Sequence, residues 1–165
     1  MRGRSTRVAA LLAAVLLAAL DQLVKQLVAS KLVVGESVPV VGDWVRLTLV
    51  ENTGLAFGAL RGRVELPILV GAAAVVILPW LILKGRVTRA ELAGVALILA
   101  GAAGNLADRL SLGYVVDFLD VGVGVWRWPA FNLADSCIVV GAVLLAIASL
   151  FGRQAGRHAV GRCRT

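Results

Sequence analysis

The sequence predicts an all-α integral membrane protein in which four transmembrane helices carry a small external β-cradle and both termini are cytoplasmic. Hydrophobic residues make up 59% of the 165 residues and charged residues only 16%. Soluble domains are about 45–50% apolar and about 25% charged, so a soluble globule of this length could not bury so much apolar surface. Disordered chains are poor in apolar residues, and that class is excluded as well.

Four apolar segments account for this composition. They cover residues 8–28, 66–83, 90–107 and 133–151. A helix needs about 20 residues to cross the apolar core of a bilayer, and lipid offers no partner for free backbone groups, so each segment is predicted to be a helix. We expect one integral membrane domain over residues 1–165, with external segments at 31–63 and 108–130.

The basic residues are distributed unevenly along the chain. The two termini and the 84–89 connection hold ten of the 17 basic residues, accompanied by a single acid, Glu91. Positively charged connections stay on the cytoplasmic side, which predicts a multi-pass protein of the inner membrane with both ends in the cytoplasm. Because these charges would lie beside anionic lipid, we expect no nucleic-acid partner from the net charge of +7.

The first span has an alternative interpretation. Residues 1–20 resemble a secretory signal, with a basic start and a long apolar stretch. The residues 17–20, Leu-Ala-Ala-Leu, form a poor small-x-small cleavage site, and the apolar pattern resumes after Asp21. The pattern favours a retained helix and leaves cleavage as the alternative.

The external segments contain strand patterns. Residues 45–49 alternate apolar and polar side chains, which predicts a half-buried strand, and residues 38–41 predict an edge strand. A turn is predicted at 52–54, and residues 114–119 are apolar except for Asp117. We expect a small sheet packed against the outer ends of the helices.

Metal chemistry and a disulfide framework are not indicated. Cys137, Cys163 and His158 are isolated from one another, and no group of residues has the spacing of metal ligands. We therefore expect no metal or other cofactor.

Acidic residues near the span ends are the first candidates for function, because acids at membrane depth are costly and commonly functional. Four residues fit this description: Asp21, Asp108, Asp117 and Asp135. Asp21 and Lys25 are four residues apart and share a helix face, so they either ease the exit of the first helix as an i,i+4 pair or help to shape a site.

The third span ends in the polar pair Asp108 and Arg109, for which an ordinary helix-end pair is the simpler interpretation. Gly101 and Gly104 permit close helix packing along this span. Such packing would bring Asn105 near its neighbours.

Asp117 and Asp135 form the most informative pair. Asp135 is explained equally well as the N3 residue of the fourth helix, with Asn132 as the N-cap. Asp117 lies in the apolar stretch 115–119, with no cation within five residues. If the two carboxyl groups meet, they share one proton, so that the ionised member can activate water while the protonated member polarises a carbonyl. This is the chemistry of an aspartic peptidase.

Five motifs in this order resemble those of bacterial lipoprotein signal peptidase, also called signal peptidase II. They cover residues 21–25, 52–58, 101–109, 116–118 and 131–135. The departures are small: Ala100 stands where many members have Gly, and Leu55 where a smaller residue is common.

The resemblance implies a catalytic dyad of Asp117 and Asp135. It implies supporting roles for Asp21, Lys25, Asn52, Gly101, Asn105, Arg109 and Asn132. Asp108 would be structural and would hold Arg109. A Gly-containing segment at 53–62 is a candidate lid over the site.

The resemblance also implies the reaction. Its substrate is a prolipoprotein carrying a diacylglyceryl-modified cysteine, which is cleaved on the amino side of that cysteine at the outer membrane interface. We expect a monomer that contacts membrane lipid and is blocked by a globomycin-type inhibitor.

Two other functions were weighed against this one. The acids could form a proton relay in a small carrier, although they lie at one end of the spans rather than midway. The chain could instead be a non-catalytic membrane subunit that docks through Gly101 and Gly104.

Overall fold

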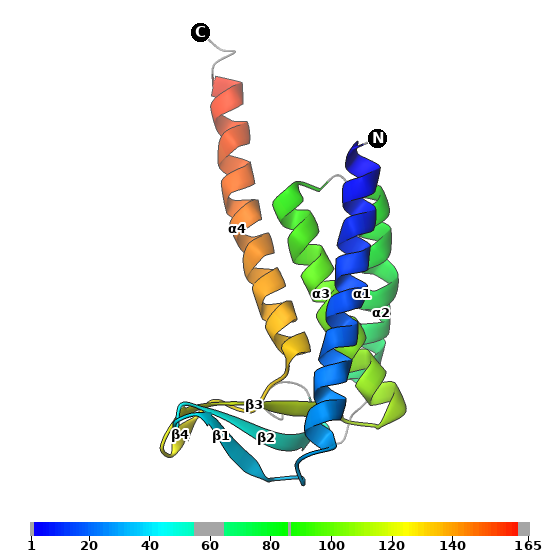
Figure 1. Ribbon diagram of the computed structural model, residues 1–165. Coiled ribbons are helices and arrows are strands. Elements are labelled where there is room, and N and C mark those ends of the chain that lie inside the picture. The colour runs from blue at the N-terminus through cyan, green and yellow to red at the C-terminus, as the bar shows by residue number, and fades with distance from the viewer. Residues whose placement is uncertain (1, 55–64, 86, 162–165) are drawn as a thin grey trace.

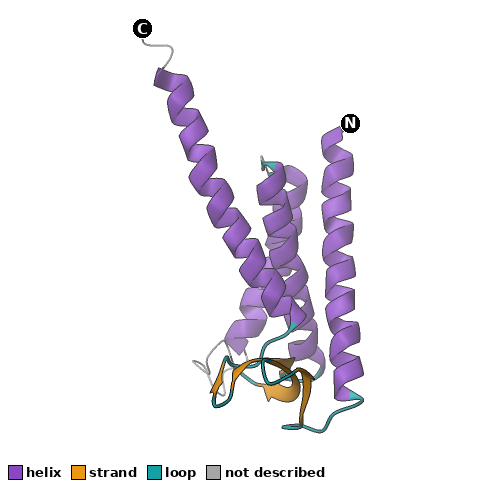
Figure 2. Cartoon of the chain, turned by 60° about the vertical axis from the view of Figure 1, so that its left-hand side comes forward, coloured by secondary structure: helices purple, strands orange, loops and turns teal. Residues whose placement is uncertain are grey.

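The computed structural model describes residues 2–54, 65–85 and 87–161. Its helices are α1 (Arg2–Ala29), α2 (Glu65–Lys84), α3 (Arg89–Ser111) and α4 (Leu133–Gly161). All four are long and apolar enough to cross a membrane, which makes this a multi-pass membrane protein. The helices run side by side, and a small sheet lies across one end of the bundle (Figure 1). The start of α1 and the end of α4 lie at the opposite end, where α4 leans away from α1 (Figure 2).

The helices contain the predicted apolar segments and extend beyond them. The largest difference among the residues near the sheet is at α3, which continues to Ser111, four residues beyond the predicted apolar segment. The helix ends where Gly113 adopts a positive φ of 82° and its N–H reaches the carbonyl of Arg109 at 3.2 Å. Polar side chains at 108 and 109 do not end the helix, because other elements supply their partners.

Helix α3 is the centre of the bundle. Ten of its residues are buried, against two in α2, and its glycines set its approach to α4. A Cβ on Gly101 would overlap the carbonyl oxygen of Ala134 and lie 2.7 Å from Cγ1 of Ile138, and a Cβ on Gly94 would lie 2.9 Å from the oxygen of Gly141. The prediction of close packing at Gly101 is confirmed.

The sheet has four antiparallel strands in the order β1-β2-β3-β4. The strands are β1 (Ser37–Val41), β2 (Val45–Asn52), β3 (Val115–Val123) and β4 (Trp126–Arg127). The two strands predicted in the first external segment are present, with β2 running to Asn52. The turn predicted after them begins there, since the Gly54 N–H donates to Oδ1 of Asn52 at 3.0 Å.

The sheet is attached to the helices through β3. Val116 and Phe118 pack with Leu49 of β2 and Val28 at the end of α1 in one buried cluster. Asp117 lies between them in sequence and therefore points to the opposite face of the strand. Because β3 is fixed to α1 on one face, its other face presents Asp117 in a defined position.

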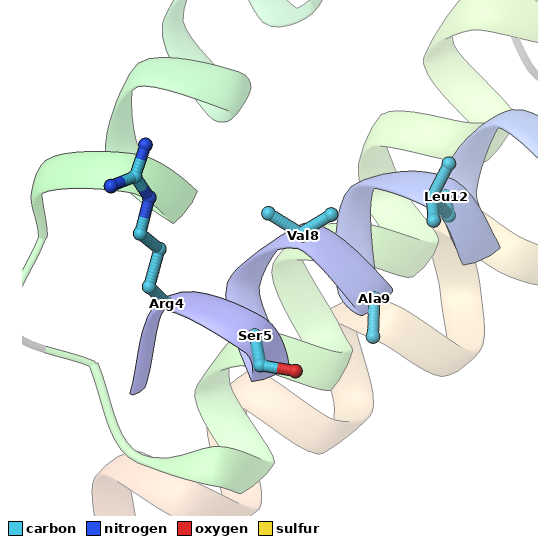
Figure 3. A pocket seen from close by; sticks show the side chains of 5 residues that line it. All are labelled: Arg4, Ser5, Val8, Ala9 and Leu12. Atoms are coloured by element: carbon cyan, nitrogen blue, oxygen red, sulfur yellow. The ribbon is translucent and has the colours of Figure 1, made fainter. Parts of the chain in front are cut away.

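At the end of the bundle opposite the sheet, Arg7 of α1 binds the end of α2. Its guanidinium donates to the carbonyl of Leu83 and, at 2.8 Å, to that of Gly85, so it satisfies carbonyl groups left free at the end of α2. An open groove along the first turns of α1, lined by Ser5, Val8 and their neighbours, lies at this same end (Figure 3). It is therefore remote from the sheet.

Candidate active site

Asp117 is the acid carried by the sheet. Asp117 is only 1% exposed. Both of its carboxylate oxygens accept hydrogen bonds from side-chain amides: Oδ2 from Nδ2 of Asn52 at 2.8 Å, and Oδ1 from Nδ2 of Asn132 at 2.7 Å. Burial, with a smaller contribution from the nearby Asp135, raises the pKa of Asp117 to about 6, although the amides of Asn52 and Asn132 and the charge of Lys25 act against the rise. A buried carboxyl group with this pKa can hold a proton close to neutral pH.

Asp135 is the acid carried by the start of α4. Its backbone N–H donates to Oδ1 of Asn132 at 2.8 Å, and its Oδ2 accepts from the backbone N–H of Asn132 at 3.3 Å. This is the reciprocal cap predicted for the helix start. Its other oxygen, Oδ1, accepts from Nδ2 of Asn105 at 2.7 Å. Asp135 therefore caps the start of α4 and also lies near Asp117. The two interpretations of Asp135, as a capping residue and as a partner of Asp117, are compatible.

Two asparagine side chains connect the acids. Asn132 is completely buried and Asn105 is 6% exposed. The Nδ2 of Asn132 that binds Asp117 also lies 3.1 Å from Oδ1 of Asn105, whose own Nδ2 binds Asp135. An asparagine pair of this kind fixes the separation and orientation of both carboxyl groups.

Lys25 supplies the buried positive charge of the cluster. Its Nζ lies 2.7 Å from Oδ2 of Asp21, 2.9 Å from Oδ2 of Asp108 and 3.0 Å from Oδ1 of Asn105. The contact with Asn105 is a hydrogen bond, and the contacts with Asp21 and Asp108 are ion pairs. The predicted Asp21–Lys25 pair is present, and it belongs to the polar cluster instead of standing alone at a helix exit.

Asp21 also connects the first helix to the last. Its Oδ1 accepts from the backbone N–H of Ala134 at 2.9 Å, one of the free donors of the first turn of α4. Gly104 makes room for this contact, because a Cβ there would lie 2.7 Å from Oδ2 of Asp21. The start of α4, and with it Asp135, is therefore held by α1.

The expectation that Asp108 holds Arg109 is wrong. Adjacent helical residues point about 100° apart, and the two side chains turn to different neighbours. Arg109 donates to the carbonyls of Asn105 at 3.2 Å and of Gly54 at 3.4 Å. Asp108 binds Lys25 and accepts from Nε2 of Gln22 at 2.7 Å.

Gln22 was missed in the sequence, although it belongs to the same motif as Lys25. It lies three residues before Lys25 and so shares its helix face. Its Nε2 also donates to the carbonyl of Gly104 at 3.1 Å. A search for polar residues at i,i+3 spacing around a buried lysine would have found it.

The charges of the cluster favour one retained proton. Four carboxyl groups, Asp21, Asp108, Asp117 and Asp135, meet two cations, Lys25 and Arg109. Uncompensated buried negative charge is costly, so a proton on the buried Asp117 lowers the free energy of the site. The arrangement can supply a base and an acid side by side.

The fold and the site together define a multi-pass membrane protein with a buried acid, Asp117, and a partly buried acid, Asp135, where its sheet meets its helices. The sequence profile described as Signal peptidase (SPase) II matches residues 13–151. The chain belongs to the signal peptidase II family, and the family assigns it a peptidase activity.

Individual relatives agree with this placement. The chain is 46% identical over 150 residues to the lipoprotein signal peptidase of Serratia marcescens, covering 87% of this chain and 86% of that one. It is 45% identical over 128 residues to the lipoprotein signal peptidase of Halothermothrix orenii, covering 78% and 86%. A solved structure described as a bacterial membrane enzyme superposes with a TM-score of 0.76 at 30% identity, covering 86% of this chain and 92% of that one. These similarities support the peptidase over the carrier and the non-catalytic subunit.

Two features of the sequence prediction lie outside the described residues. Most of the candidate lid, 53–62, falls in the range 55–64, and so does Leu55. The lid stays a prediction.

Proposed function

We propose that this protein is an aspartic endopeptidase that removes signal peptides from diacylglyceryl-modified prolipoproteins. It cleaves the peptide bond on the amino side of the lipidated cysteine. The observation that carries the proposal is the buried asparagine pair, Asn105 and Asn132, which holds Asp117 and Asp135 in one hydrogen-bonded unit.

The reaction uses one proton shared by the pair. Asp135, at the N-terminal end of a helix where negative charge is stabilised, is the ionised member and takes a proton from the attacking water. Asp117 carries a proton because of its raised pKa and donates it to the scissile carbonyl oxygen. As the tetrahedral intermediate collapses and the C–N bond breaks, Asp135 gives the proton taken from water to the amine of the departing cysteine, and one hydroxyl of the intermediate returns a proton to Asp117, which leaves a carboxylic acid as the other product.

The surrounding polar groups orient the pair and the substrate. Asn52, Asn105 and Asn132 present N–H donors to the carboxyl oxygens, and Arg109 places a cation next to the segment that follows β2. Lys25 and Asp21 hold these groups in place from α1, and Gly101 lets α4 approach α3. Preorganised donors and charges of this kind cost no reorganisation during the reaction.

The location follows from the charge distribution. The positively charged ends of the chain lie at the end of the bundle opposite the sheet (Figure 1), so both termini face the cytoplasm and the acids lie at the outer interface of the inner membrane. The acyl chains of the substrate lie among the helices, where each buried CH₂ contributes about 0.8 kcal/mol. The protein acts as a monomer and needs no cofactor.

A lipidated peptide assay tests the substrate class. The purified protein in detergent is expected to cleave a peptide with a diacylglyceryl cysteine at least about 100-fold more efficiently than the same peptide with free cysteine, because the acyl chains supply most of the binding. Mass spectrometry identifies the cut, and a globomycin-type inhibitor is expected to block it. Equal cleavage of both peptides would refute the substrate class, and proton flux in liposomes that depends on Asp117 would favour the carrier.

The pH dependence tests the shared proton. Since the pKa of Asp117 is raised to about 6, this group keeps its proton at pH 5 and loses it as the pH rises through 6. We expect kcat/KM, which reports ionisations of the free enzyme, to fall on the alkaline side of about pH 6. A profile that stays flat from pH 5 to about pH 7.5 would contradict the assignment of the proton to this pair.

A further inference from the structure

We propose that Asp108 is a positioning residue for the reaction and that it acts on Asp117 through the backbone of β3. The inference rests on the proposed function, in which Asp117 is a catalytic acid. It replaces the expectation that Asp108 only supports its neighbour Arg109.

The contacts of Asp108 join three elements. The residue is 2% exposed and lies near the end of α3. On the side of α1, its Oδ1 accepts from Gln22 and its Oδ2 pairs with Lys25 at 2.9 Å. On the side of the sheet, the same Oδ2 accepts from the backbone N–H of Val116 at 3.1 Å.

The contact with Val116 bears directly on the neighbouring acid. Val116 precedes Asp117, and its N–H belongs to the planar peptide unit between Val115 and Val116, so the contact with Asp108 fixes the strand backbone one residue before the acid. The carbonyl of Val116 is also near Nδ2 of Asn132, at 3.3 Å. The N–H and the carbonyl of Val116 are therefore both bound by polar side chains of the site, Asp108 and Asn132.

The lysine connects this contact to the other acid. Lys25 forms an ion pair with Asp108 and donates a hydrogen bond to Asn105, and Asn105 donates to Asp135. One buried ammonium group therefore supports Asp135 through an asparagine and Asp117 through Asp108. A shift of Asp108 would change the separation of the two acids.

Two replacements of Asp108 separate its hydrogen-bond role from its charge. Asp108→Ala removes the acceptor for Val116, whereas Asp108→Asn keeps one acceptor oxygen for Val116 and removes the charge and the acceptor for Gln22. In both variants Lys25 stays paired with Asp21 at 2.7 Å, so neither leaves an unpaired buried cation.

The test measures kcat and KM separately for the lipidated peptide. Since misplacement by about 1 Å can cost about 100-fold, we expect Asp108→Ala to lower kcat by about 10- to 100-fold with KM changed less than about twofold. Asp108→Asn is expected to restore kcat to within about threefold of the unmodified protein. If Asp108 only stabilised the fold, Asp108→Ala would lower the temperature midpoint of unfolding without lowering kcat selectively over KM. Asp108→Asn would then not restore kcat.

Hydrogen exchange at the Val116 amide supplies a measurement that is independent of activity. Exchange is expected to speed up in Asp108→Ala and to stay near the original rate in Asp108→Asn. Equal losses of kcat in both variants, or unchanged exchange in Asp108→Ala, would overturn the inference. If the unmodified protein does not cleave the lipidated peptide, the proposed function fails instead, while the exchange result still decides whether Asp108 holds β3.

Discussion

Replacing Asp117 or Asp135 by Asn is expected to lower the rate of prolipoprotein cleavage by at least about 1,000-fold, since each change removes either the acid or the base. Asn has nearly the same size as Asp, so the amide contacts from Asn52 and Asn105 lose a charged acceptor without leaving a cavity. The variants should insert into the membrane in normal amounts. The measurement is single-turnover cleavage of the lipidated peptide by purified protein.

The matched control is Asp43→Asn, the same chemical change at an exposed carboxylate. Asp43 lies between β1 and β2, where it accepts from the backbone N–H of Gly124 at 2.7 Å. It lies outside the cluster of acids, and we expect its replacement to leave the rate within about twofold, as surface changes usually do. Cleavage at the normal rate by either Asp117→Asn or Asp135→Asn would disprove the dyad.

Gly101→Ala is expected to damage both stability and activity, although it adds only one methyl group. The new Cβ would overlap the carbonyl oxygen of Ala134, the residue before Asp135, so α3 and α4 must separate. Overpacking of this kind costs about 1–3 kcal/mol, and a displacement of about 1 Å at an acid costs about 100-fold in rate. Thermal unfolding and kcat/KM measured on the same preparation separate these two effects.

Gly3→Ala makes the same change where nothing lies within 4 Å of the added atom. It is expected to leave the unfolding midpoint and kcat/KM unchanged within error. If Gly101→Ala behaves like this control, the close approach of α3 and α4 does not position Asp135.

Much of this fold was predictable because lipid offers no hydrogen-bond partners, so every backbone group in a spanning segment must be satisfied within the protein. Four apolar runs had to become four helices, and alternation over residues 45–49 indicated β2. The acids could be identified because burying an unpaired carboxylate costs free energy, so a carboxylate such as Asp117 in an apolar stretch needs partners. What the pattern could not specify is which partners it has, because Asn52 and Asn132 come from segments 65 and 15 residues away.

The errors arose at helix ends. The predicted third apolar segment ends at residue 107, whereas α3 continues to Ser111, and Gln22, Lys25 and Val116 bind the Asp108 carboxylate there. The glycine at 113, which ends the helix with its positive φ, was the available signal. Contacts between distant segments decide such cases, and a single sequence does not display them.

The contact between Asp21 and the backbone of Ala134 has a consequence for biosynthesis. These residues are 113 positions apart, so the start of α4 receives this partner only after the whole chain up to α4 has entered the membrane. A nascent chain with three helices inserted has Asp21, Lys25, Asn105 and Asp117 but lacks Asp135 and its cap. With the dyad proposed above, proteolytic capacity is expected to appear only when the last helix is in place.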